Sequence, residues 1–128
     1  MKRVSQLAGV LLVGMFVFTG VAAAHPPSAL TVSYKADEGL LKIEISHPVE
    51  NVSDHYVEDV DVEVDGEDVA DLSYSAQMDR QGQMVLVTIG YFNEGTNVKV
   101  EADCNEFGDL EFTGKIPAAR PGEFAGLE

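Results

Sequence analysis

Beyond residue 28, apolar and polar residues alternate along most of the chain, which is the pattern of β-strands that bury one face. The clearest case is the segment 56–64, in which Val60, Val62 and Val64 are expected to face one way and the acidic residues between them the other. The Asp65-Gly66 pair that follows is a strong signal for a hairpin turn. No segment of this part has helical periodicity, so the sequence predicts an all-β domain.

Short strands separated by turn residues are expected throughout this part of the chain. We place them at residues 29–34, 41–46, 56–64, 69–75, 84–91, 97–102 and 110–113. The segment 84–91 has the most continuous apolar run and is expected to be a central strand. The pattern favours an immunoglobulin-like antiparallel β-sandwich of about seven strands over residues 25–116, with a small barrel as the alternative. Residues 117–128 contain proline, glycine and alanine and are expected to form a flexible tail.

The first 24 residues have the three parts of an export signal. Met1-Lys2-Arg3 is positively charged, an apolar stretch follows from Leu7 to Val21, and Ala22-Ala23-Ala24 is a small-residue cleavage site. We therefore expect a signal peptide at residues 1–24, cleavage before His25, and a periplasmic or extracellular location. No cysteine lies at the cleavage site, so a lipid anchor is not expected.

The strong negative charge excludes two classes of partner. The chain has a formal net charge of −14, and cleavage would change it to −16 because Lys2 and Arg3 are lost. Such a surface repels phosphate backbones and anionic lipid headgroups. We therefore expect neither nucleic acid nor a membrane surface as a partner.

The chain has three histidines and one cysteine, all outside the predicted signal peptide: His25, His47, His55 and Cys104. A sandwich gathers loops from distant parts of the sequence at its two ends, so these side chains could converge. Imidazole and thiolate together suit zinc, iron or copper rather than calcium or magnesium. The alternatives are that the histidines are ordinary polar loop residues, and that Cys104 is a buried thiol or forms an intermolecular disulfide.

Two histidine motifs and a cysteine motif resemble a known family. His47-Pro48-Val49 and Asp54-His55-Tyr56-Val57 resemble segments of the desulfoferrodoxin and superoxide reductase family, and Cys104-Asn105 followed by Gly108 resembles its cysteine loop. The resemblance covers roughly residues 41–108. It implies an immunoglobulin-like sandwich with a ferrous iron held by four equatorial histidines and one axial cysteine. In that family the open sixth position of the iron reduces superoxide to hydrogen peroxide.

Carried over by position, the resemblance implies that His47 and His55 are the middle histidine ligands and that Cys104 is the axial thiolate. His25 is the candidate for the first histidine, because it also precedes a proline-containing segment before the first strand. The implied cofactor is non-haem iron, and the implied substrate is superoxide or a related small oxidant. The electron donor is not indicated, and whether the chain forms a homodimer is left open.

The chain departs from the family pattern at three points. Phe107 stands where the cysteine loop of the family has a histidine, so one imidazole is missing. His47 and His55 are eight positions apart, two more than is usual in the family. The family's Glu-Lys pair before the first histidine is absent, which removes a positive charge that would attract an anionic radical.

These departures leave other functions open. At most three histidines and one thiolate remain, a set that suits a four-coordinate zinc or an iron with further open positions. Copper is another candidate, because the amine and ring of an N-terminal His25 could chelate it together with one loop histidine. Pro26 has no amide hydrogen and offers no competing backbone ligand. If the histidines and the thiol do not meet, the chain is a non-catalytic interaction domain.

Overall fold

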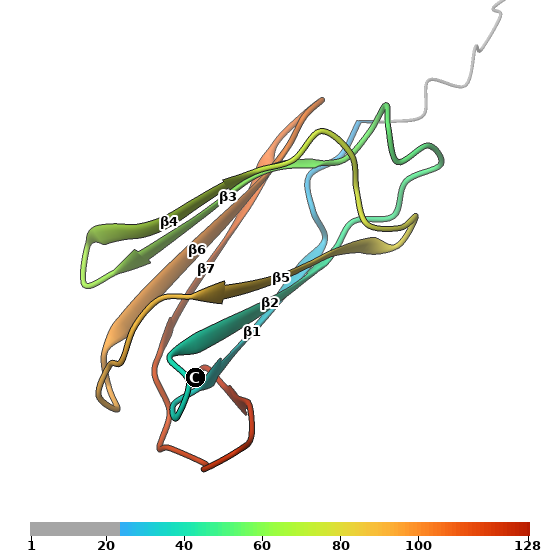
Figure 1. The fold of residues 1–128 in the computed structure, drawn as a ribbon. Helices are drawn as coiled ribbons and strands as arrows, with labels where there is room; N and C mark the ends of the chain where they lie inside the picture. Colours follow the sequence, from blue (N-terminus) through green and yellow to red (C-terminus); the bar gives the residue numbers. More distant parts are fainter. Residues whose placement is uncertain (1–23) are drawn as a thin grey trace, which may run out of the picture.

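The computed structural model describes residues 24–128, which form two antiparallel β-sheets stacked face to face (Figure 1). The predicted signal peptide, apart from Ala24, lies outside the described residues. Within residues 24–128, no helix is long and apolar enough to span a membrane.

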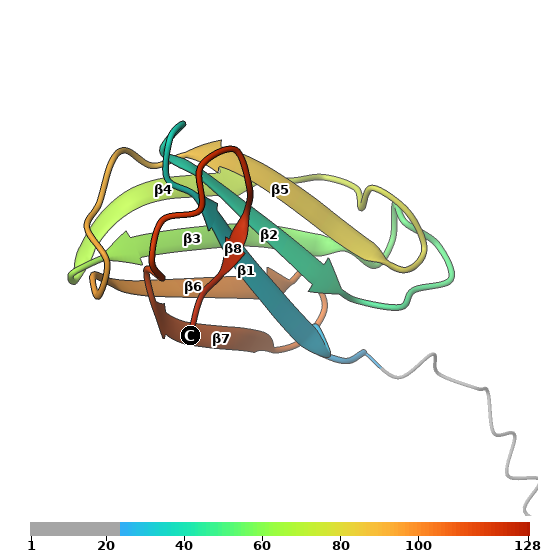
Figure 2. The same ribbon diagram turned by 90° about the horizontal axis from the view of Figure 1, so that it is seen from below.

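Each sheet has four strands. One has the order β5-β2-β1-β8 and the other the order β4-β3-β6-β7, and Figure 2 shows the two layers stacked. The bounds are β1 Ala29–Lys35, β2 Leu40–Ser46, β3 Val57–Val64, β4 Glu67–Ser73, β5 Gly82–Thr88, β6 Asn97–Cys104, β7 Asp109–Lys115 and β8 Ala125–Gly126. The immunoglobulin-like β-sandwich predicted from the alternation is confirmed, and so are the hairpins β1–β2 and β3–β4.

Alternate residues of the two sheets build the core between them. On β3, Val60 and Val62 are fully buried, as are Leu41 and Ile43 on the facing β2. Burying one such side chain stabilises the fold by about 1.5–3 kcal/mol. Tyr34 is 2% exposed, and its hydroxyl donates to Gly90 O at 2.6 Å, which fixes β1 to the segment after β5.

The expected central position of the strand at 84–91 is wrong. The observed strand, β5, lies at the edge of its sheet and pairs only with β2 among the described strands. Val85 is buried, whereas Met84 is 39% and Leu86 54% exposed, so the apolar run includes residues of the outer face. An unbroken apolar run is typical of a strand covered on both faces, but here the outer face is open.

The end of the chain differs from the expected flexible tail. Ala125 and Gly126 form β8, which pairs with β1 and adds a strand to the seven predicted. Ala125 is 6% exposed, and the backbone of Glu128 exchanges hydrogen bonds with Lys115. These contacts come from residues far apart in sequence, so local composition does not reveal them.

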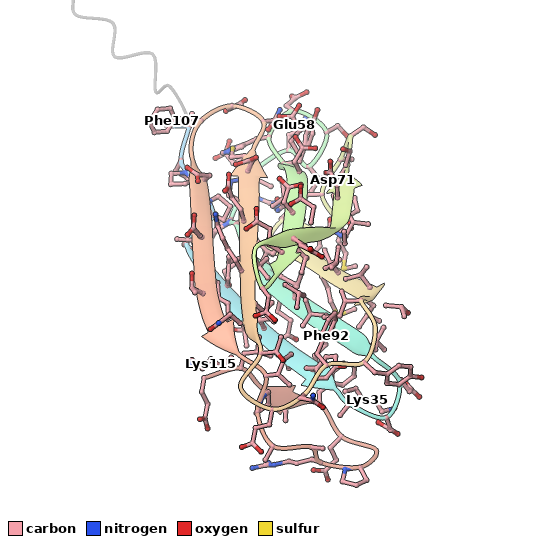
Figure 3. The ribbon with its side chains drawn as sticks, turned by 90° about the vertical axis from the view of Figure 1, so that its left-hand side faces the viewer. Lys35, Glu58, Asp71, Phe92, Phe107 and Lys115 are labelled. Atoms are coloured by element: carbon pink, nitrogen blue, oxygen red, sulfur yellow. The ribbon has the colours of Figure 1, made fainter. Side chains whose placement is uncertain are left out.

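Carboxylates cover the outer face of the β4-β3-β6-β7 sheet, the face turned toward the viewer in Figure 3, where Asp71 is labelled. Asp61 lies directly opposite Asp71 on one neighbouring strand and Glu101 on the other. Like charges that face each other across strands are destabilising. Partial burial, a hydrogen bond with Asp71 and the nearby acidic groups raise the pKa of Asp61 to about 6.

This crowding predicts a pH-dependent stability. The pKa of Asp61 is raised on folding, so its contribution to the free energy of unfolding is fully present at low pH. That contribution is lost as the pH rises through about 6. Asp61→Asn should therefore stabilise the domain near neutral pH, by about 0.5 kcal/mol. It should also gain less stability than the wild type when denaturant unfolding is repeated at about pH 5. Asp37→Asn, in the exposed β1–β2 turn, removes the same charge but should change neither the stability near neutral pH nor the gain at about pH 5. Equal effects of the two variants would contradict the account.

Candidate metal site

The antiparallel pairing brings the four candidate ligands to one end of the sandwich. His25 precedes β1 and His47 directly follows β2, and these strands pair so that Ala29 lies opposite Ser46. His55 lies just before β3 and Cys104 ends β6, with Val57 opposite Cys104. This is the end of the molecule at which β2 ends and β3 begins, at the upper right of Figure 1.

The three histidine rings form one compact group. The ring centroids are 4.9 Å apart for His25 and His47, 4.9 Å for His25 and His55, and 4.6 Å for His47 and His55, all with edge-to-face geometry. One nitrogen from each ring lies within 4.8 Å of the others, close enough for all three to hold one metal ion. His47 is fully buried and His55 is 9% exposed.

Both ring nitrogens of His47 face hydrogen-bond acceptors. Nδ1 lies 2.8 Å from Oε1 of Gln77, and Nε2 lies 3.1 Å from the carbonyl oxygen of His25. A neutral imidazole carries one N–H and one lone pair. One of these two contacts therefore lacks a proton unless His47 is charged.

Both ring nitrogens of His25 also face hydrogen-bond acceptors. Its Nδ1 lies 3.0 Å from the carbonyl oxygen of Pro26, and its Nε2 lies 2.9 Å from that of Pro48. Carbonyl oxygens accept hydrogen bonds and never donate them. A neutral His25 can therefore satisfy only one of these two oxygens.

His55 connects the histidine group to the cysteine. Its Nε2 lies 3.1 Å from Sγ of Cys104, and its Nδ1 lies 3.9 Å from a carboxylate oxygen of Glu106. Burial is the main cause that lowers the pKa of His55, and the nearby His47 lowers it further, whereas Glu106 opposes both. A neutral ring with an available lone pair is the form that binds a metal ion.

Around the rings of His25 and His47 there are more acceptors than protons. The four ring nitrogens of His25 and His47 face four acceptor oxygens, but two neutral rings supply only two N–H groups. His55 adds no such shortage, because the thiol of Cys104 can donate its own proton to Nε2. Protonating both rings would put two positive charges on rings whose centroids are 4.9 Å apart, one of them on the fully buried His47, which is costly. A cation held by the ring lone pairs resolves the mismatch, so the donor set fits a metal ion.

Cys104 lies at the edge of the histidine group. It is 7% exposed, and its sulfur accepts the backbone N–H of Glu106 at 3.4 Å. It touches His55 but is not among the residues whose ligand atoms all lie within 4.8 Å of one another. The structure therefore brings His25, His47 and His55 together, with Cys104 next to one of them.

Phe107 does not take part in the site. It is 64% exposed, and in Figure 3 its ring projects outward beside the β6–β7 turn.

Next to His55 is a hollow of about 240 Å³ that is lined by Glu50, Asn51, Asp54, His55 and Glu106. Three carboxylates thus surround the approach to His55 from solvent.

Sequence reasoning missed Gln77, a buried residue of the β4–β5 loop that contacts His47. It belongs to no motif, and a single glutamine between turn residues looks like an ordinary surface residue. Only its position in space links it to the site.

Comparisons with known proteins agree with the fold. No family model matches the sequence, and no curated protein matches it. Among solved structures, a crystal structure of superoxide reductase in the oxidized state matches with a TM-score of 0.52 and 13% sequence identity, covering 73% of this chain and 91% of that chain. The domain therefore has a superoxide-reductase-like fold, and the family resemblance predicted from the motifs is confirmed at the level of the fold.

The position of His25 depends on Gly108 in the β6–β7 turn. Gly108 has a φ of +79°, and a Cβ there would lie 3.0 Å from Cβ of Pro26, the residue after His25. Gly108→Ala should therefore shift the N-terminal segment and change the NMR signals of the His25 ring. The positive φ alone should cost about 1–2 kcal/mol.

Gly122→Ala is the matched control, because Gly122 has a φ of +76° with nothing within 4 Å of the added Cβ. It should lose similar stability without changing the His25 signals. If both variants leave those signals as in the wild type, Gly108 does not position His25.

Proposed function

We propose that this chain binds a transition-metal ion through His25, His47 and His55, with Cys104 as a further ligand, and that the bound metal is iron used in redox chemistry. The observation that carries the proposal is the shortage of protons around His25 and His47, two of the three rings that lie close enough to hold one ion. A site made only of structural histidines would pair each N–H with an acceptor and each lone pair with a donor.

The contact between Cys104 and His55 also supports a shared ion. With metal–sulfur and metal–nitrogen bonds of about 2.3 and 2.1 Å, two ligands at a right angle lie about 3.1 Å apart. Sγ of Cys104 and Nε2 of His55 are separated by 3.1 Å. The spacing therefore agrees with two adjacent ligands of one ion.

The finer proposal is that iron in this site reduces superoxide or a related small oxidant. Iron would supply the electron that, together with two protons, converts superoxide to hydrogen peroxide. In this chain Cys104 would donate electron density through its thiolate, and the three imidazoles would hold the ion. Glu106, with its side chain 40% exposed beside His55, lies where it can exchange protons with water.

The charge of the chain favours a neutral oxidant over an anionic one. Glu50, Asp54 and Glu106 line the hollow beside His55, and the net charge is −14. Negative charge around an approach slows the arrival of anions. Slow reaction with superoxide and faster reaction with a neutral peroxide would fit this surface.

Zinc is the second candidate, because one specific observation favours it. Phe107 supplies no ligand, so the nitrogen and sulfur side-chain donors at this end of residues 24–128 are three imidazoles and one thiol. Four nitrogen and sulfur donors are the usual set of a structural zinc. The predicted export signal would place either activity in the periplasm or outside the cell.

Metal content tests the binding proposal. Protein purified without a histidine tag or chelator should hold about one transition-metal ion per chain by plasma mass spectrometry. His47→Ala should lose it, since the other ligands cannot hold the ion alone. Glu101→Gln is the control, because Glu101 belongs to a separate carboxylate group with Asp103 and Asp109. Metal lost with Glu101→Gln but kept with His47→Ala would contradict the proposal.

Superoxide decay tests the redox proposal separately. The iron-loaded protein should speed the decay in proportion to its iron content, and the zinc-loaded protein should not, because zinc has no redox chemistry. Equal decay with either metal would leave a metal-binding domain without this activity.

A further inference from the structure

Gln77 is the most fully bonded polar side chain next to the histidine group. It lies in the β4–β5 loop and is 4% exposed. Its backbone N–H donates to Val52 O at 2.9 Å, in the loop that carries His47 and His55. Its side-chain amide makes four further hydrogen bonds, which use both amide hydrogens and both lone pairs of the oxygen.

Backbone groups fix which way this amide points. Nε2 donates to the carbonyl oxygen of His47 at 2.7 Å and to that of Asp79 at 2.9 Å, and these oxygens can only accept. Oε1 accepts the N–H of Val57 at 3.2 Å, which can only donate. A flipped amide would set like groups against each other at all three contacts, so the orientation is determined.

The fixed amide in turn determines the tautomer of His47. Oε1 of Gln77 lies 2.8 Å from Nδ1 of the ring, so that nitrogen must carry the hydrogen. In a neutral ring the lone pair is then on Nε2, the nitrogen on the side of His25. Histidines that bind metals commonly donate their second N–H to such an acceptor, which sets the ring orientation and raises its basicity.

We propose that Gln77 is a positioning residue that holds His47 in the Nδ1–H tautomer and presents Nε2 to the metal ion. The inference rests on the proposed metal site, but it makes a claim about the ring that can be measured without metal. The side chain acts through His47 and does not itself contact the ion.

Two substitutions separate positioning from packing. Gln77→Glu keeps an acceptor for Nδ1–H but loses the two donors that hold the carbonyl oxygens of His47 and Asp79. Gln77→Leu loses both functions. Gln83→Leu is the matched control, because Gln83 is also buried, at 8% exposed, and bonds to Met78 and Met84 rather than to a histidine.

The readouts are the ring tautomer of His47 and the affinity for zinc. Nitrogen NMR of the metal-free protein should show Nδ1–H in the wild type and in Gln77→Glu, and should lose that preference in Gln77→Leu. Zinc affinity, measured by competition with a coloured chelator, should fall about 10–100-fold in Gln77→Leu. It should stay close to the wild-type value in Gln77→Glu and Gln83→Leu, although both should lose stability in denaturant.

Several results would overturn the inference. An Nε2–H tautomer in the wild type would do so directly, even if Gln77→Leu does not fold. Loss of zinc affinity in Gln77→Glu as large as in Gln77→Leu, or an equal loss in Gln83→Leu, would show that packing alone matters. A wild-type protein that binds no zinc or iron would contradict the proposed function. The tautomer of His47 in the metal-free protein would still test whether Gln77 orients the ring.

Discussion

Three imidazole rings share one end of the sandwich, and the acceptors around two of them, His25 and His47, require more protons than neutral rings possess. This imbalance is created by backbone carbonyls, which are placed by the fold itself: those of His25, Pro26 and Pro48 each face a ring nitrogen. His25 and His47 lie 4.9 Å apart between ring centroids and His47 is fully buried, so placing a charge on both rings is costly. A metal cation satisfies the lone pairs without adding protons, and the proposed function follows from this constraint.

The sandwich provides the geometry because strands from distant parts of the chain begin and end at the same edge. The pairings of β1 with β2 and of β3 with β6 set the histidines and Cys104 beside one another. Gln77 lies in the β4–β5 loop, and its side-chain oxygen accepts hydrogen bonds from both the His47 ring and the backbone N–H of Val57 at the start of β3. The valine core holds these strands at a fixed distance, so the site is supported by the same packing that stabilises the domain.

Much of the fold could be predicted because alternation is a local property of the sequence. The valines of residues 60–64 identify a buried face, and Asp65-Gly66 identifies the turn after it. Whether β5 lies at the centre or the edge of its sheet depends on the other strands. Its outer face carries apolar residues, so the sequence of the strand resembles that of a central one. The pairing of Ala125 with β1 depends on a long-range contact and left no sign in the composition.

The site was predictable only as a set of candidates. The residue types of His25, His47, His55 and Cys104 indicate metal chemistry, and the sandwich explains why they could meet. Their arrangement in space, with three rings close together and the thiol beside His55, is a property of the folded loops. Gln77 belongs to no motif, so its contact with His47 could be found only in the structure.

Cobalt(II) spectroscopy tests the central claim most directly, because this ion reports its ligands through visible absorption. Adding one equivalent to metal-free protein should produce visible bands and a near-ultraviolet thiolate charge-transfer band. His47→Ala should abolish the visible bands, and Cys104→Ser should remove the charge-transfer band alone. Absence of any visible band in the wild type, or a spectrum unchanged by His47→Ala, would contradict a metal site at the histidine group.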